Sequence, residues 1–110
     1  MVLDKINLEQ NNLSSYIIKI ERSYKKNLEL KKRLNHYAYE PRTYKQYQKL
    51  DDIKLRMKLL HISHLNLMHT LKEPANFVEV HLQKINEQLE ESKLLDISVN
   101  EYINSTKSTI

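Results

Sequence analysis

Apolar side chains recur at helical spacing in three long stretches of the chain. The first stretch places them three or four residues apart, at Leu13, Ile17, Ile20, Tyr24 and Leu28. This spacing puts them on one face of a helix. The pattern predicts an amphipathic helix over about residues 4–39, ended by Pro41, because the residue before a proline is disfavoured in helical conformation.

The second stretch predicts a helix over about residues 43–72. Thr43 and Gln46 match a capping box, in which two side chains satisfy backbone N–H groups of the first turn. A coiled-coil-like stripe follows at Leu50, Ile53, Met57, Leu60, His64, Leu67 and Leu71. A second apolar set lies on other faces, at Leu55, Leu59, Ile62, Leu65 and Met68. A helix that is apolar all round has to be covered on more than one side, so this is the predicted central helix.

The third stretch predicts a helix over about residues 74–95, with Pro74 in its first turn. Its apolar stripe comprises Val78, Leu82, Ile85 and Leu89. Ser98 and Glu101 match another capping box, which predicts a separate helical turn over about residues 99–104 and a loose tail over 105–110.

These elements predict an all-α fold of one domain over residues 1–110. Its architecture is expected to be a three-helix bundle, or a helical hairpin plus a third helix. Long coiled-coil-like helices would be broken at Pro41 and Pro74, with a short fourth turn near the C-terminus. The chain contains no glycine, which argues against tight hairpins and glycine-rich phosphate loops.

Charge is distributed unevenly along the chain. Residues 1–40 carry eight basic and five acidic side chains, residues 41–73 seven and three, and residues 74–110 three and six. The acidic last third either neutralises basic charge within the fold or provides a second face for a partner.

The composition also limits the expected cellular location of the protein and the kinds of site that it can form. Cysteine is absent, which excludes disulfides and thiolate metal sites. No signal peptide and no apolar stretch long enough to span a bilayer are recognisable. We therefore expect an intracellular protein of the cytoplasm or nucleus, neither secreted nor transmembrane, without a membrane partner.

The five histidines do not predict a catalytic or metal site. His61 and His64 lie three residues apart, and no acidic residue lies between Asp52 and Glu73, whereas zinc sites on helices usually use a spacing of four and need three or four ligands. His64 falls on the core stripe, where a buried imidazole with hydrogen-bond partners is expected. A pH-responsive interface at His61 and His64 is the alternative. We expect no enzyme, cofactor, metal or small-molecule substrate.

A basic face on the first helix suggests nucleic-acid binding as one alternative function. Clustered cations neutralise phosphates, and the candidate residues are Arg22, Lys25, Lys26, Lys32 and Arg33. Lysine outnumbers arginine fourteen to four, whereas base readout and bidentate phosphate contacts favour arginine. If this alternative holds, we expect accessory binding of nucleic acid rather than sequence-specific recognition.

Four tyrosines around Pro41 either cover the end of the bundle or contact a partner, because tyrosine is enriched at interface hot spots. The first helix, roughly 50 Å long, is also expected to extend past a small bundle. We therefore predict a non-catalytic adaptor or scaffold subunit that binds helical proteins, with a hetero-complex favoured over a homodimeric bundle. The predicted contact residues are Leu13, Ile17, Ile20, Tyr24, Tyr37, Tyr39, Tyr44, Tyr47, Leu55, Leu59 and Ile62.

Overall fold

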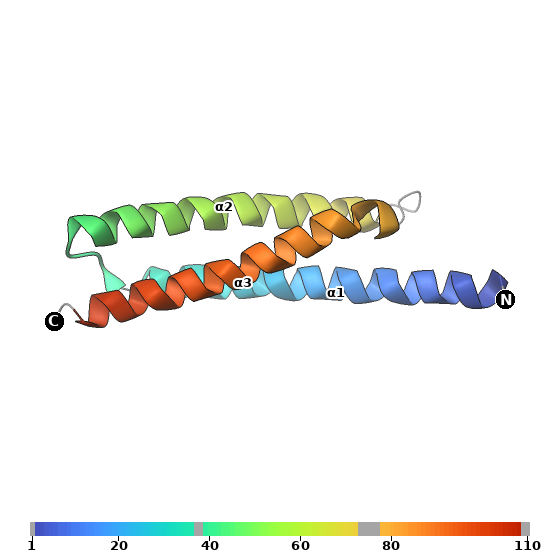
Figure 1. Cartoon of the computed structure of the whole chain (residues 1–110), viewed down its shortest axis with the longest axis horizontal. Coiled ribbons are helices and arrows are strands. Elements are labelled where there is room, and N and C mark those ends of the chain that lie inside the picture. The colour runs from blue at the N-terminus through green and yellow to red at the C-terminus, as the bar shows by residue number, and fades with distance from the viewer. Residues whose placement is uncertain (1, 37–38, 73–77, 109–110) are drawn as a thin grey trace.

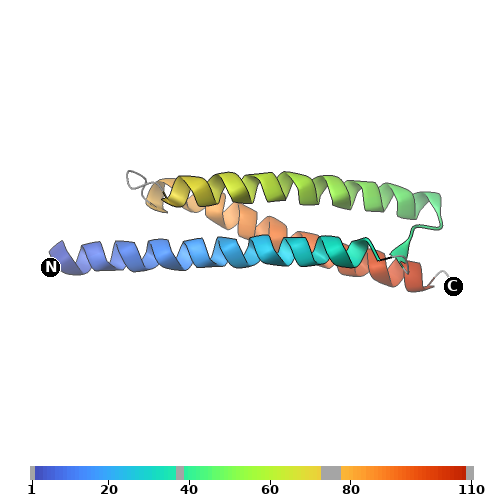
Figure 2. The ribbon, with the colours of Figure 1, turned by 180° about the vertical axis from the view of Figure 1, so that it is seen from behind.

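The computed structural model describes residues 2–36, 39–72 and 78–108, with side chains in the ranges 14–36, 39–72 and 80–107. It forms three helices, α1 (Val2–Leu34), α2 (Tyr44–Lys72) and α3 (Val78–Ser108), and the described residues contain no strand. α1 and α3 run in the same direction, and α2 runs antiparallel to both (Figures 1 and 2). The predicted all-α, bundle-like class is confirmed.

The bundle is a rod of 63 × 19 × 18 Å. It is longer than any one helix, since the 33 residues of α1 span about 50 Å at 1.5 Å per residue. The helices are staggered: the N-terminal part of α1 extends beyond α2 and α3 at one end, as Figure 1 shows. The expected overhang of the first helix is therefore present.

The interior consists of two apolar clusters along the rod. The smaller one joins all three helices through Ile20, Leu67, Leu71 and Ile85. The larger one comprises Leu30, Leu34, Leu50, Ile53, Met57, Leu60, Leu95, Val99, Tyr102 and Ile103. Every member of the stripe predicted for the second helix is buried, and burial of each large apolar side chain contributes about 1.5–3 kcal/mol.

The connection between α1 and α2 begins earlier than predicted. α1 ends at Leu34, well before Pro41, so the expected helix to residue 39 is too long. His36 N–H donates to the carbonyl of Arg33 at 3.3 Å, which tightens the last turn. Leu34 is also the last α1 residue in the larger cluster. Pro41 lies outside both helices, and Pro74 lies outside the described residues.

The predicted capping box at the start of α2 is confirmed. The Gln46 backbone N–H donates to Thr43 Oγ1 at 3.1 Å, and Gln46 Oε1 accepts from the Thr43 backbone N–H at 3.3 Å. Gln46 is buried, and its Nε2 donates to the carbonyl of Ser105 at 3.2 Å. One side chain therefore caps α2 and also joins it to the C-terminal part of α3.

α3 continues without a break to Ser108, which corrects the predicted helix end at residue 95, the separate turn over 99–104 and the loose tail. Residues 109–110 of that tail lie outside the described part. The helix continues because its buried stripe continues, through Leu95, Val99, Tyr102 and Ile103. Ser98 does not cap a new helix: its Oγ accepts a hydrogen bond from Arg56 at 3.1 Å.

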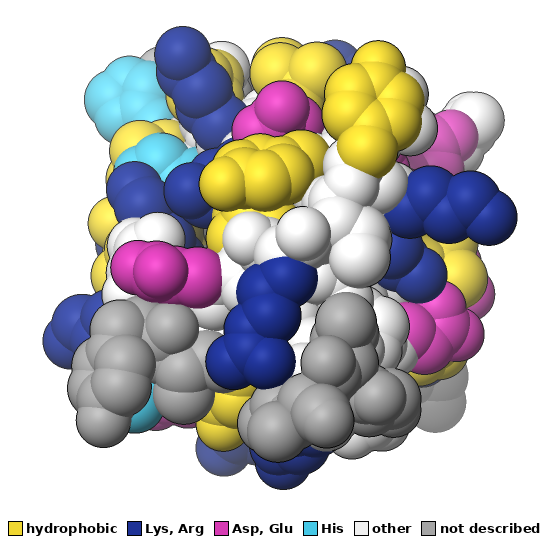
Figure 3. All heavy atoms as spheres, turned by 90° about the vertical axis from the view of Figure 1, so that its left-hand side faces the viewer, with side chains coloured by type: hydrophobic (Ala, Val, Ile, Leu, Met, Phe, Trp, Pro, Cys, Tyr) yellow, Lys and Arg dark blue, Asp and Glu magenta, His cyan; other side chains and the backbone are white. Residues whose placement is uncertain are grey.

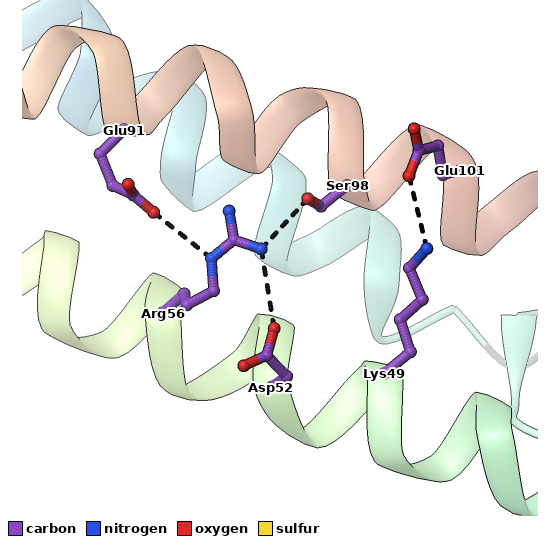
Figure 4. A network of polar contacts seen from close by, with 6 residues as sticks. All are labelled: Lys49, Asp52, Arg56, Glu91, Ser98 and Glu101. Carbon is purple, nitrogen blue, oxygen red and sulfur yellow. Dashed lines mark hydrogen bonds and ion pairs between the residues drawn. The ribbon is translucent and has the colours of Figure 1, made fainter.

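Ion pairs join carboxylates of α3 to cations of the other helices. Arg56 lies between Glu91, at 3.3 Å, and Asp52, at 3.7 Å (Figure 4). Two further pairs are Lys49–Glu101, at 3.4 Å, and Lys26–Asp96, at 3.3 Å. Partly exposed pairs of this kind contribute about 0–1 kcal/mol each. Some of the acidic charge of the last third is thus neutralised within the chain.

Two isoleucines of α3 provide a matched test of its continuation. Ile103 is 1% exposed and Ile97 is 53% exposed. Ile103→Ala is expected to lower the free energy of unfolding by about 2–5 kcal/mol, because it leaves a cavity in the larger cluster. Ile97→Ala should change it by less than about 1 kcal/mol. Urea titration followed by circular dichroism measures both, and equal effects would contradict the packing of residues 99–108.

Candidate interaction surface

A chain of three polar side chains, two of them buried and one half-buried, crosses the bundle between the two apolar clusters. Ser23 of α1 lies 2.8 Å from His64 Nε2, and Gln88 Oε1 of α3 lies 2.8 Å from His64 Nδ1. Gln88 Oε1 is an acceptor only, so Nδ1 carries the proton and Nε2 accepts from the Ser23 hydroxyl. The imidazole is fully buried, as expected for His64, and each ring nitrogen has a partner.

The contact between Ser23 and His64 has the residue types of a nucleophile and its base, but not the carboxylate and the exposure that such a pair needs. A serine next to a histidine can act as a nucleophile when a carboxylate orients the imidazole. Here Gln88 stands in the carboxylate position, and Ser23 and His64 are both buried. Sequence reasoning missed Ser23 and Gln88 as partners because they lie 41 and 24 residues from His64. The sequence feature that could have indicated this contact is the presence of polar residues on otherwise apolar helix faces.

The outer side of α2 carries an apolar surface that the bundle does not cover. Leu55, Leu59, Ile62 and Leu65 are 43–57% exposed and follow one another three or four residues apart, which aligns them along the helix. Tyr44 and Tyr47 are exposed on the first turn of the same helix. We call these six residues the α2 outer face. Met68, the remaining member of the second apolar set, packs against the smaller cluster instead.

The predicted contact residues of α1 lie mostly inside the bundle. Ile20 is fully buried against α2 and α3, so it belongs to the core and is not available to a partner. Ile17 packs against the same cluster, and the Tyr24 ring stacks on His61 at 5.0 Å between centroids. A periodic stripe does not distinguish a partner from the rest of the same chain, which explains the error for Ile20. The side chain of Leu13 lies outside the described residues.

The three described tyrosines near Pro41 differ in their environments. Tyr39 packs against the larger cluster, and its carbonyl accepts a hydrogen bond from Tyr102 at 2.6 Å. Burial raises the pKa of Tyr102, which keeps that phenol protonated as a donor. Tyr44 and Tyr47 are exposed, and Tyr37 lies outside the described residues. Figure 3 shows this end of the rod, where hydrophobic side chains are exposed among charged ones.

The basic residues of α1 do not form one free surface. Lys26 pairs with Asp96, and Arg33 donates to Asn100 at 3.1 Å, so both contact α3. Arg22, Lys25 and Lys32 are exposed. Among the described residues, no group of three or more histidine or acidic side chains is placed to hold a metal ion, and no helix is long and apolar enough to cross a membrane.

Comparison with models of known protein families found no match, and comparisons with curated proteins and with solved structures found no significant one.

The buried imidazole makes stability depend on pH. Burial lowers the pKa of His64 below 6.5, helped by nearby His61 and opposed by the hydrogen bond with Gln88. The unfolded chain therefore takes up a proton first on acidification, and the free energy of unfolding falls as the pH drops below 6.5. The loss is complete below the pKa of the folded state.

Denaturant titrations between about pH 7.5 and 5 measure this loss. His64→Gln removes the titrating group and keeps a polar side chain, so it should remove this contribution and flatten the profile. His69→Gln, at an exposed position of the same helix, should retain the wild-type slope. Parallel profiles for wild type and His64→Gln would show that His64 does not cause the pH dependence.

Proposed function

We propose that this chain is a non-catalytic helical adaptor or scaffold subunit of an intracellular multi-protein complex. It binds a helical protein partner along the α2 outer face. The observation that carries the proposal is the line of half-exposed Leu55, Leu59, Ile62 and Leu65. Contiguous apolar surface of this kind on a soluble domain is typical of interaction sites.

The fold does not need this surface for its own core. The buried stripe of α2 already packs against both neighbouring helices. The exposed side chains of Leu55, Leu59, Ile62 and Leu65 lower solubility without adding to that core. Covering it with a partner removes apolar area from water, at about 25 cal/mol per Å². The spacing of three and four residues fits the ridges and grooves of another helix.

Two features favour a different protein over a second copy as the partner. Lys58 lies between Leu55 and Leu59 along α2, and Lys54 lies one turn before it. A symmetric pairing of two α2 helices about Leu59 brings the two Lys58 side chains together, and like charges at an interface oppose association. Tyr44 and Tyr47 supply large contact areas with polar tips at one end. A self-contained homodimer is the alternative.

Nucleic-acid binding is a second alternative, and the contacts of Lys26 and Arg33 with α3 count against it. It requires binding that weakens steeply with salt. Charge reversal at Lys25 and Lys32, which are exposed, abolishes such binding if this alternative holds.

A double substitution on the α2 outer face tests the proposal. Leu59→Glu with Ile62→Glu is expected to change the free energy of unfolding by no more than about 1 kcal/mol, because both side chains face water. It should abolish recovery of the wild-type partner in affinity purification from native cells followed by mass spectrometry. Leu60→Glu is the adjacent control: Leu60 is 4% exposed, so this change should unfold the bundle.

Two results would contradict the proposal. One is recovery of the same partners in the same amounts by the double variant. The other is a stable dimer of the purified wild type in sedimentation velocity that the double variant dissociates, with no second protein recovered. That result favours the homodimeric alternative.

A further inference from the structure

A cavity of about 400 Å³ lies in the groove between α1 and α2. Its apolar lining comes from Leu28, Leu34 and Met57, and Lys31, Lys54 and Lys58 contribute three exposed lysines to its wall. None of its lining residues among those described is acidic. The volume falls in the range of sites that hold a ligand or a large side chain.

The three lysines of this cavity carry charge that no described carboxylate pairs with. In the described part of the chain, none of their ammonium groups has an ion pair, whereas Lys26, Lys49 and Lys72 each pair with a carboxylate. Three cations around an apolar lining produce a positive potential, which attracts an acidic partner.

One residue that lines this cavity carries a buried hydrogen-bond acceptor. The residue is Asn27, which is 3% exposed. Asn27 Nδ2 donates to the carbonyl of Met57 at 3.2 Å, and this contact fixes the orientation of the amide, because reversal would oppose two acceptors. The other amide atom, Oδ1, is buried and has no partner within the described residues. Such a group is normally satisfied, so a donor that enters beside Asn27 would complete the hydrogen bonds of this amide.

We propose that this cavity receives a tryptophan or tyrosine side chain of the partner protein, from a segment in which acidic residues flank that ring. The inference rests on the proposed function and names the chemistry of the same partner. The ring fills the apolar part, and its indole N–H or phenol O–H donates to Asn27 Oδ1. Tryptophan and tyrosine both combine a large apolar ring with a donor, and they dominate interface hot spots.

The geometry of α2 also specifies where the acidic residues lie. Lys54 and Lys58 are four residues apart, so they lie one helical turn apart on the same side. Two carboxylates one turn apart on a helical partner therefore meet both ammonium groups. The cavity adjoins the α2 outer face, since Lys58 lines the cavity and Ile62 lies one helical turn further along the same side. One partner helix along that face can thus place a side chain into the groove.

Selection from a displayed library of random peptides against the full-length chain tests this chemistry. Enriched peptides are expected to contain Trp or Tyr with two or more Asp or Glu residues within a helical turn. Their binding should fall at least tenfold on Lys54→Glu with Lys58→Glu. Enrichment of neutral or basic peptides, equal binding to the charge-reversed chain, or no enrichment would each overturn the proposal.

A coupling measurement isolates the donor to Asn27. The selected peptide is compared with its Tyr→Phe form, or with naphthylalanine in place of Trp, which retains the rings without the donor. Wild type should favour the donor-bearing peptide by roughly tenfold, the usual effect of leaving a buried group unpaired. Asn27→Leu should bind both forms alike. Equal discrimination by wild type and Asn27→Leu would overturn the assignment of Oδ1.

The controls separate this inference from the proposed function. If the cavity is not used, Leu59→Glu with Ile62→Glu still removes the native partner, while Lys54→Glu with Lys58→Glu does not. If the proposed function is wrong, the selected peptide binds the cavity, but no native partner depends on the α2 outer face. Anionic phosphatidylserine vesicles provide a further comparison. Binding to vesicles that is lost on charge reversal, without any enriched peptide, would assign the lysines to a lipid surface and overturn the proposal.

Discussion

The structure depends on the hydrogen bonds of one fully buried side chain, His64. Each of its two ring nitrogens needs a partner, and each neighbouring helix provides one. Ser23 of α1 and Gln88 of α3 provide those contacts at 2.8 Å. Apolar layers tolerate sliding by a turn, because one leucine packs much like another. A polar layer does not, since sliding leaves donors or acceptors buried without partners. The layer therefore specifies the register of all three helices, as polar core residues do in coiled coils.

The register of the three helices in turn determines which face of α2 remains exposed to solvent. Once His64 points into the bundle, Leu60 and Leu67 pack on either side of it, and the second apolar set faces outward except for Met68. The contacts of Gln46 with Ser105 and of Arg56 with Glu91 act in the first half of α2. The exposed leucines and isoleucine are thus a consequence of a satisfied interior, and rotation of α2 to hide them would bury its polar face.

The parts of this fold that local sequence determines were predictable, and the parts that depend on distant contacts were not. The α2 stripe and the Thr43–Gln46 capping box follow from spacing and from residue type, and both are present. At Ser98, a local capping signal competed with the continuing stripe of α3, and burial of Tyr102 outweighed it. The sequence predicted a second apolar set on α2 that has to be covered, but not the cavity beside it, which requires side chains of α1 and α2 together.

The cavity between α1 and α2 shows how the uneven charge of the chain is used. The acidic residues of α3 reach cations on the faces of α1 and α2 that adjoin it. Lys31, Lys54 and Lys58 line the groove between those two helices, and the three paired carboxylates of α3 contact other cations. The α1–α2 groove also has an ion pair, Lys72 with Glu21 at 3.3 Å, but this pair lies further along the helices than the residues that line the cavity. An acidic partner completes this groove, and an aromatic donor satisfies Asn27 at the same place. The positive charge, the apolar lining and the buried amide oxygen of this cavity therefore all fit the same partner segment.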